Sequence, residues 1–228
     1  MILVKDVMLS ACAGKVFGII EYKIKHMIIK MLSIFLLSLT LYSCSDSSKN
    51  LSLLSSGATI LAFGDSLTHG TGANKDEDYP TLLAELTNFK VINAGVPGEI
   101  SSKGLERLPN LLDLHNPDLL ILTHGGNDIL KKLSRKEQKS NLLAMIELAK
   151  MRNIQIAMLG VPEPGIFLKS AEIYEQIANE ANIPIQLSLL PDILGDNSLK
   201  SDFAHPNARG YQQIAEGIVE FLEDNGAL

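Results

Sequence analysis

Short apolar runs alternate with longer helix-like segments from residue 59 to the end of the chain, and this alternation constrains the fold more than any other feature. The runs are rich in Ile, Leu and Val, and Gly, Pro or Asn residues bound them. Such runs are typical of strands buried on both faces of a parallel sheet. They occupy residues 59–63, 90–95, 118–123, 154–160 and 183–188.

The segments between these runs carry helix signals. Pro80 stands near the start of residues 79–87, where its missing N–H costs nothing, and Ser134 with Glu137 forms a capping-box pattern. Strands that alternate with helices predict an α/β domain whose parallel sheet has helices on both faces, and such sheets bind ligands at the carboxyl ends of their strands. The predicted helices occupy residues 79–87, 101–115, 134–152, 170–181 and 207–224.

The N-terminal part of the chain has a different character. An apolar stretch from Met31 to Tyr42 is too short for a membrane span of about 20 residues, but it suits the core of a secretory signal peptide. It ends in "LYSC", which resembles the cleavage site of bacterial lipoproteins and implies lipidation of Cys44. An uncleaved anchor helix is the alternative interpretation.

These signals predict three parts of the chain. Residues 1–43 are interpreted as an upstream extension and a lipoprotein-type signal peptide, residues 44–57 as a Ser-rich tether, and residues 58–228 as the folded domain. We therefore expect an exported bacterial protein, periplasmic or associated with the outer membrane through a lipid anchor. The net charge of −6 disfavours nucleic acid as a partner, because binding to phosphates needs a basic surface.

Polar clusters follow the predicted strands at the edge of the sheet where ligands bind. "GDS" (64–66) follows the first run, "NAGVPG" (93–98) ends the second and "GGND" (125–128) follows the third. "DFAHPN" (202–207) lies in a late loop. Although these clusters are distant in sequence, a doubly wound sheet would bring them to one edge.

A serine, a histidine and an aspartate in these clusters have the pattern of nucleophilic catalysis. A Ser hydroxyl needs a base, which is commonly a His oriented by a carboxylate. Asp202 stands three residues before His205, so one local turn can join them. We therefore expect Ser66 as nucleophile, His205 as base and Asp202 as its partner, with Asp65 as a brace for the turn at Ser66. Taken alone, Ser66 would be interpreted as a helix cap.

The oxyanion formed in acyl transfer needs hydrogen-bond donors that already point at it. The candidates are the backbone N–H groups of Ser66 and of the "GVPG" turn, and the side-chain amide of Asn127. His69 and His124 are weaker candidates for the base, because neither has a carboxylate placed like Asp202. They are interpreted as a loop residue and as a strand-end residue that lines or borders the cleft.

Other chemistries fit the sequence poorly. No G-x-G-x-x-G follows the first strand, and there is no Walker A motif. No cysteine pair or His-x-x-x-His is spaced for zinc, so no metal site is predicted. "GDSLT" departs from the G-x-S-x-G nucleophile elbow at Thr68.

With these clusters the sequence resembles the SGNH (GDSL) hydrolases, whose four blocks carry Ser, Gly, Asn and His. "GDSLT", "GGND" and "DFAHPN" match three blocks, and "VINAGVPGEISSKGLERLP" resembles the thioesterase I, lysophospholipase and arylesterase branch. The resemblance covers about residues 58–226. It implies a flavodoxin-like three-layer α/β/α domain with five parallel strands that needs no metal or cofactor.

The resemblance also implies residue roles and an activity. Gly98, rather than Gly95, would be the glycine donor of the oxyanion hole, beside Asn127 and the N–H of Ser66. The implied function is hydrolysis of small-molecule carboxylic esters or thioesters by a monomer, through an acyl-enzyme on Ser66. A carbohydrate O-acetyl esterase and a non-catalytic binding module on the same fold are the alternatives.

Acyl-chain preference stays open at the sequence level. The loop at residues 161–170 carries Ile166, Phe167 and Leu168, which either line an acyl groove or pack under the following helix.

Overall fold

The structure is a computed structural model that describes residue 27, residues 50–165 and residues 168–228. Apart from residue 27, the predicted extension and signal peptide at residues 1–43 lie outside the described residues, as do the lipidation site Cys44 and residues Ile166 and Phe167. Within the described ranges, no helix is both long and apolar enough to cross a membrane.

Five parallel strands form the central sheet in the order β2-β1-β3-β4-β7. Counted along the chain this is the 2-1-3-4-5 order of flavodoxin-like domains, which confirms the predicted fold class. The strands fall on the five predicted runs: β1 (Thr59–Gly64), β2 (Lys90–Gly95), β3 (Leu119–Thr123), β4 (Gln155–Leu159) and β7 (Ile185–Gln186).

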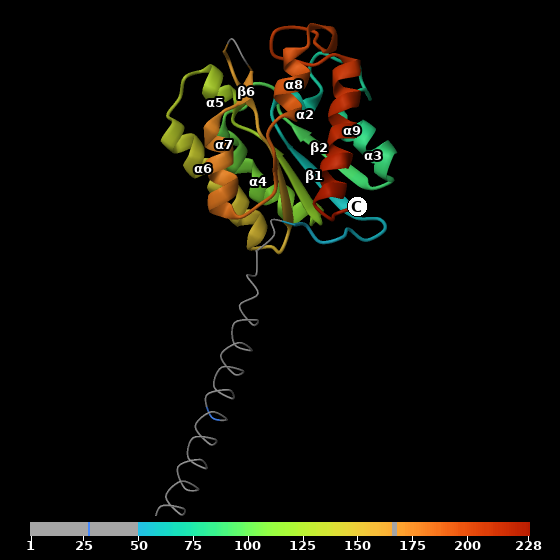
Figure 1. The fold of residues 1–228 in the computed structure, drawn as a ribbon, viewed down its shortest axis with the longest axis vertical. Coiled ribbons are helices and arrows are strands. Elements are labelled where there is room, and N and C mark those ends of the chain that lie inside the picture. Colours follow the sequence, from blue (N-terminus) through green and yellow to red (C-terminus); the bar gives the residue numbers. More distant parts are fainter. Residues whose placement is uncertain (1–26, 28–49, 166–167) are drawn as a thin grey trace, which may run out of the picture. The chain divides into compact units, whose positions relative to one another are not determined.

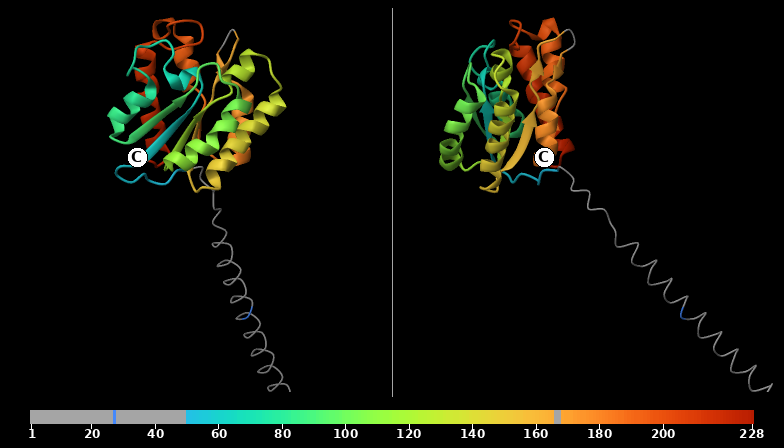
Figure 2. Two further views of the ribbon diagram at one scale, coloured as in Figure 1. Left: turned by 180° about the vertical axis from the view of Figure 1, so that it is seen from behind. Right: turned by 90° about the vertical axis from the view of Figure 1, so that its left-hand side faces the viewer.

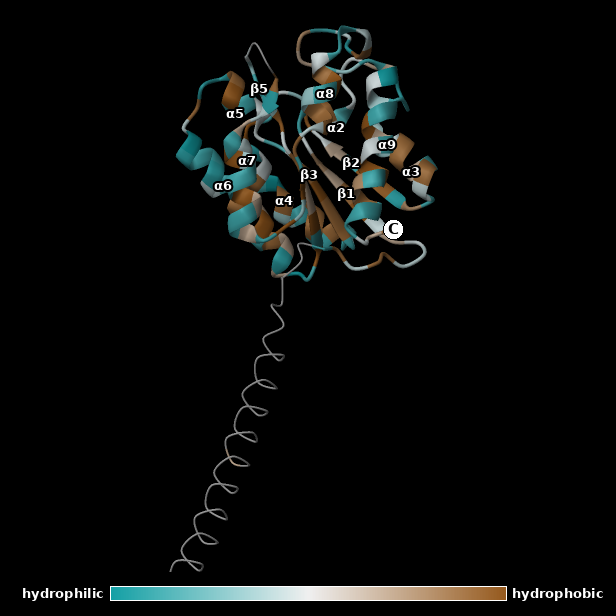
Figure 3. Ribbon diagram, in the orientation of Figure 1, coloured by the Kyte–Doolittle hydropathy of each residue, from teal (hydrophilic) through white to brown (hydrophobic). Residues whose placement is uncertain are grey.

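Burial differs between the middle and the edges of the sheet. β1, β3 and β4 are almost fully buried, and Figure 3 shows β1 and β3 as the hydrophobic centre of the domain. The expectation of burial on both faces is wrong for the edge strands β2 and β7. An edge strand has only one neighbouring strand, so part of β2 stays exposed, including Lys90 and Asn93.

Helices cover both faces of the sheet. Helices α3 and α9 pack against each other, as do α4 and α6, and α6 also contacts α7. Figures 1 and 2 show α9 and α4 on opposite sides of the sheet, which gives the three layers. The bounds agree with the predicted helices to within two residues: α3 (Tyr79–Thr87), α4 (Ser101–His115), α6 (Arg135–Lys150), α7 (Glu172–Ala181) and α9 (Ala208–Asp224).

The sequence does not predict several short elements, because they are too short to show a periodicity of apolar residues. A two-stranded antiparallel hairpin forms within the predicted loop at 161–170. The short elements are α2 (Ser66–His69), α5 (Gly126–Leu130), β5 (Pro162–Glu163), β6 (Lys169–Ser170), α8 (Leu189–Gly195) and the 3₁₀-helix η1 (Asn197–Leu199).

The described end of the predicted tether packs on the domain. The Leu51 N–H donates to the Asn225 carbonyl at 2.8 Å, and the Leu54 N–H donates to the Ala227 carbonyl at 2.9 Å. The Leu54 side chain is buried in the core. Residues 50–57 therefore extend the folded unit, because the side chains of Leu51 and Leu54 pack on the core and the C-terminal backbone pairs with theirs.

Candidate active site

Ser66 begins the short helix α2 directly after β1, at the carboxyl edge of the sheet. Asp65, and not Ser66, is the N-cap: its Oδ1 accepts from the N–H of Leu67 at 3.1 Å. Gly64 permits the sharp turn, because a Cβ there would lie 2.2 Å from the Thr68 hydroxyl oxygen. The hydroxyl of Ser66 is thus left available for other contacts.

That hydroxyl lies within hydrogen-bond distance of the His205 ring. The His205 Nε2 lies 3.0 Å from the Ser66 Oγ, although the residues are 139 positions apart. The other ring nitrogen, Nδ1, lies 2.8 Å from Oδ2 and 3.0 Å from Oδ1 of Asp202. Because a carboxylate can only accept, Nδ1 carries the proton and Nε2 is free to accept from Ser66.

The Asp202 carboxylate is held by its own loop. Its Oδ1 accepts from the N–H groups of Ala204 at 2.7 Å and His205 at 2.9 Å. Partial burial acts to raise the pKa of Asp202, but the hydrogen bonds from the His205 ring and from these N–H groups leave it below its ordinary value. Asp202 therefore stays ionised beside the imidazole, as a partner of a histidine base must.

Asn127, in α5, is held by the residue beside Ser66. Its Nδ2 donates to Oδ2 of Asp65 at 3.1 Å. Asp65 is buried, and this burial raises the pKa of its carboxyl. Asp65 therefore contacts both the turn of Ser66 and the Asn127 amide, and the second contact is one that the sequence does not indicate.

Gly98 lies at the tip of a tight turn after β2. The Glu99 N–H donates to the Val96 carbonyl at 3.2 Å, Pro97 takes the second position and Gly98 the third with φ of 77°. This is the pattern of a type II turn, which needs a positive φ at its third position and so favours glycine there. The bond within the turn uses the N–H of Glu99, and among the described residues the N–H of Gly98 has no hydrogen-bond partner.

Ser66, Gly98, Asn127 and His205 line one cleft of about 450 Å³. Asp65 also reaches the cleft, whereas Asp202 lies behind His205 and does not line it. The rest of the wall is mostly apolar and comprises Leu67, Thr71, Pro97, Gly126, Leu130, Val161, Pro162, Pro164, Gly165, Leu168, Leu194, Phe203 and Ala204. The four distant sequence clusters therefore converge as predicted.

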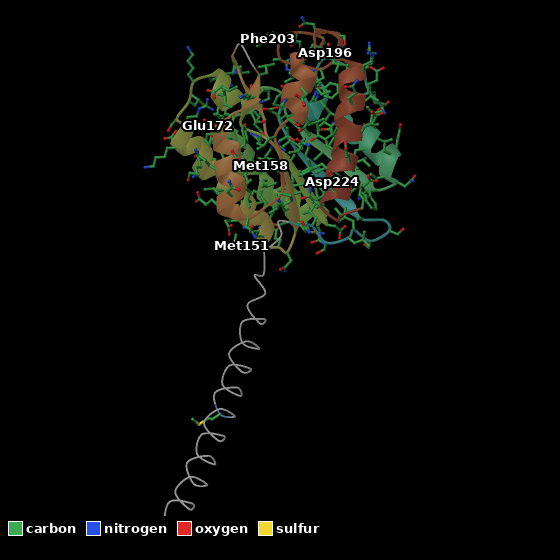
Figure 4. All side chains as sticks on the ribbon, viewed as in Figure 1. Met151, Met158, Glu172, Asp196, Phe203 and Asp224 are labelled. Atoms are coloured by element: carbon green, nitrogen blue, oxygen red, sulfur yellow. The ribbon has the colours of Figure 1, made fainter. Side chains whose placement is uncertain are left out.

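Phe203 lies between Asp202 and His205 in the chain, and the residue is 81% exposed. Figure 4 shows it at the end of the domain opposite Met151, which follows α6. A large aromatic side chain thus stands at the rim of the cleft.

The two weaker histidine candidates lie apart from this cleft. His69 ends α2 and is exposed. His124 follows β3, as expected, but it is fully buried and does not line the cleft, so of the two expected places, lining or bordering the cleft, the first is wrong. It contacts Glu99, which in turn binds Arg107, and the sequence offers no signal for this cluster because His124 lies after β3, far along the chain from the other two.

Within the described ranges, no three His, Cys, Asp or Glu side chains gather closely enough to hold a metal ion. The chemistry available at the cleft is that of a hydroxyl, an imidazole and preset hydrogen-bond donors.

The chain is similar in sequence to known proteins. The chain is 30% identical over 198 residues to an arylesterase from Vibrio mimicus, and the match covers 82% of this chain and 96% of that protein. It is 27% identical over 173 residues to the thioesterase 1/protease 1/lysophospholipase L1 of Escherichia coli strain K12, covering 72% of this chain and 83% of that protein.

The fold is also similar to solved structures. The psychrotrophic esterase EstA from Pseudoalteromonas sp., inhibited by monoethylphosphonate, superimposes with a TM-score of 0.66 at 26% identity, covering 73% of this chain and 97% of that chain. Residues 62–213, which contain all four clusters, match the model of the GDSL-like lipase/acylhydrolase family. The match covers well over half of the chain, and the chain belongs to this family.

Proposed function

We propose that this protein hydrolyses carboxylic esters and thioesters through an acyl-enzyme on Ser66. The observation that carries the proposal is the continuous hydrogen-bonded series from Asp202 through His205 to Ser66, which opens onto a cleft lined by Gly98 and Asn127. The arylesterase, thioesterase and esterase activities of the relatives support the same reaction class.

In the first half of the reaction, the Ser66 Oγ attacks the acyl carbonyl while the His205 Nε2 takes the hydroxyl proton. The Asp202 carboxylate stabilises the imidazolium that forms. The carbonyl oxygen becomes an oxyanion, and the N–H groups of Ser66 and Gly98 and the amide of Asn127 donate to it. His205 then returns the proton to the leaving oxygen or sulfur as the C–O or C–S bond breaks.

In the second half, water attacks the acyl-enzyme. His205 takes a proton from the water, the same donors hold the new oxyanion, and the proton returns to the Ser66 Oγ as the acid leaves. The free enzyme is restored, and each turnover converts one ester or thioester and one water into an acid and an alcohol or thiol.

The composition of the cleft wall favours an apolar acyl group. Leu67, Leu130, Val161 and Leu168 present apolar surface beside Ser66. Apolar surface gains free energy when it covers a hydrocarbon chain, by roughly 25 cal/mol per Å². We therefore infer a preference for esters with apolar acyl chains over the acetyl esters of sugars.

A Ser66→Ala variant tests the proposal. It should keep the fold and lose hydrolysis of p-nitrophenyl esters, while the exposed Ser56→Ala serves as the matched control. A fluorophosphonate probe should label the wild type and Ser56→Ala but not Ser66→Ala. Hydrolysis by Ser66→Ala at the wild-type rate would reject the nucleophile, and an unlabelled wild type would favour a non-catalytic binding module.

We also propose that the protein is exported and held at a membrane by a lipid on Cys44. The support is the apolar stretch before "LYSC". In a bacterial host, Cys44→Ala should move the protein from the membrane fraction to the soluble fraction, and Cys12→Ala is the matched control. If Cys44→Ala stays with the membrane, an uncleaved helix replaces the lipid anchor as the explanation.

A further inference from the structure

The three proposed oxyanion donors come from three separate segments. Ser66 follows β1, Gly98 lies in the turn after β2, and Asn127 follows β3. Donors act on a transition state only if their positions relative to one another are preset, because reorganisation during the reaction cancels the gain. Some feature of the protein must therefore fix these segments to one another.

The carboxylate of Glu99 lies where the three segments meet. Glu99 directly follows Gly98, and its side chain is only 8% exposed. Its Oε2 accepts from Nη2 of Arg107 at 2.7 Å and from Nε of Arg107 at 2.9 Å, while Oε1 accepts from the same Nε at 2.8 Å. The same Oε2 lies 3.0 Å from the His124 Nε2.

Arg107 connects Glu99 to the ends of β1 and β2. Its Nη2 also donates to the carbonyl of Gly64, two residues before Ser66, at 3.2 Å, and to the carbonyl of Ala94 at 2.9 Å. The guanidinium lies 4.1 Å above the centre of the Phe63 ring in β1. Arg107 therefore ties the turn of Gly98 to the ends of β1 and β2.

His124 connects Glu99 to the end of β3. The N–H of Gly125 donates to its Nδ1 at 2.8 Å, so Nε2 holds the ring proton and donates it to Glu99. The ring also stacks on Phe63, with 5.6 Å between centroids. A Cβ on Gly104 of α4 would lie 2.4 Å from this Nε2, so only glycine lets the helix pass here.

Stability alone does not account for such a cluster. Buried ion pairs are often no more stabilising than apolar side chains of the same volume, because desolvation offsets the attraction. Burial acts to raise the pKa of Glu99, yet the hydrogen bonds from His124 and Arg107 lower it to about 2, so the carboxylate keeps its charge. What the cluster does supply is a fixed distance between three strand ends.

We propose that Glu99 is a positioning residue which, through Arg107 and His124, sets the Gly98 N–H relative to Ser66 and Asn127 in the oxyanion hole. The inference rests on the proposed function. A second connection joins the start of α4, which follows this turn, to α5, because Asp128 accepts from the N–H and hydroxyl of Ser101 at 2.8 and 2.6 Å. Loss of Glu99 alone should therefore loosen the turn of Gly98 rather than unfold it.

The test compares Glu99→Gln with the wild type on p-nitrophenyl butyrate. The turnover number kcat should fall by about 10- to 100-fold, the range expected when a reacting geometry shifts by about 1 Å, and KM should change by less than about twofold. Inactivation by a fluorophosphonate should slow by a similar factor, because its tetrahedral phosphorus uses the same donors. The control is Glu106→Gln, which breaks an exposed ion pair with Lys103 on the same helix and should leave kcat unchanged.

A double variant separates positioning from general damage. The substitution Gly98→Ala is strained at the φ of 77° and should displace the donor by itself. If Glu99 acts through Gly98, Glu99→Gln should add little to the loss of kcat in Gly98→Ala. If the two losses multiply, the positioning role is overturned.

Folding is checked by circular dichroism, and activity is measured well below each thermal midpoint. If Glu99→Gln does not fold, Arg107→Lys takes its place, because lysine keeps a charge but cannot reach the carboxylate and both carbonyls. A folded variant with wild-type kcat overturns the positioning role. If the wild type is labelled at Ser66, only this inference then fails, whereas an unlabelled wild type overturns the proposed function as well.

Discussion

The molecule contains two histidine–carboxylate pairs of similar geometry in opposite environments. His205 and Asp202 are three residues apart in an open loop, and the Asp202 side chain is 49% exposed. His124 and Glu99 are 25 residues apart and almost completely buried. The distance from nitrogen to carboxylate oxygen is 2.8 Å in the open pair and 3.0 Å in the buried pair.

The difference lies in the second nitrogen of each ring. In His205 that nitrogen faces the Ser66 hydroxyl in the cleft, so it can take and return a proton. In His124 it accepts from the backbone N–H of Gly125, so both ring nitrogens are used inside the protein. A histidine–carboxylate pair is thus a candidate base only when one ring nitrogen faces substrate.

The largest expected effect tests directly whether the open and the buried histidine have different roles. Replacement of the open histidine, His205→Gln, should lower kcat by about 10⁴- to 10⁶-fold, because no base then activates Ser66. The buried replacement, His124→Gln, should lower kcat by no more than about 100-fold and should also lower the thermal midpoint. Steady-state kinetics and thermal denaturation of both variants check this, and equal losses of kcat would remove the distinction.

The next effect concerns the donors that the buried pair supports. Asn127→Ala removes one donor and should lower kcat by about 10²- to 10³-fold. The exposed Asn74→Ala serves as control. A loss below about threefold would exclude Asn127 from the oxyanion hole.

The third expected effect is on the acid dependence of stability, which should differ between the carboxylates of Glu99 and Asp202. The pKa of Glu99 is lowered from an ordinary 4.5 to about 2. Glu99 therefore contributes stability that is fully present above about pH 4.5 and is lost as the pH falls towards 2. Urea denaturation at pH 5 and pH 3 should show a larger loss of unfolding free energy in the wild type than in Glu99→Gln.

In the same urea denaturation, removal of the carboxylate of the open pair should change the acid-dependent loss of unfolding free energy by less than Glu99→Gln does. The pKa of Asp202 is also lowered, so its contribution has the same sign, but solvent screens an exposed pair. Asp202→Asn should therefore keep most of the acid dependence of the wild type. If Glu99→Gln and the wild type lose stability equally between pH 5 and 3, the buried pair is not the acid-sensitive one.

The smallest expected effect is at the rim of the open pair. Phe203→Ala should change the free energy of unfolding by less than about 0.5 kcal/mol, because the ring is exposed. KM for long-chain esters should rise by up to about tenfold, which corresponds to about 1.4 kcal/mol of lost contact. Met151→Ala, exposed at the opposite end of the domain, should leave KM unchanged, and a similar rise there would rule out a role for Phe203.

The open pair could be predicted from the sequence, and the buried pair could not. Asp202 and His205 are near neighbours whose contact needs only a local turn. Glu99 and Arg107 are also close in sequence, but nothing there indicates that His124 joins them, because that contact depends on the order of β2, β1 and β3 in the sheet. The link from Asp65 to Asn127 was missed for the same reason.

By itself, the sequence determined the strands, the long helices, the parallel sheet and the four clusters at its edge. The strands and helices follow from the periodicity of apolar residues, and the parallel sheet with its polar edge follows from the alternation of strands and helices along the chain. Only the tertiary structure decided that β2 is exposed at the edge, that Asp65 caps α2 while holding Asn127, and that Glu99 joins three strand ends. Those features depend on which segments become neighbours when the sheet assembles, and the local sequence carries no record of its distant neighbours.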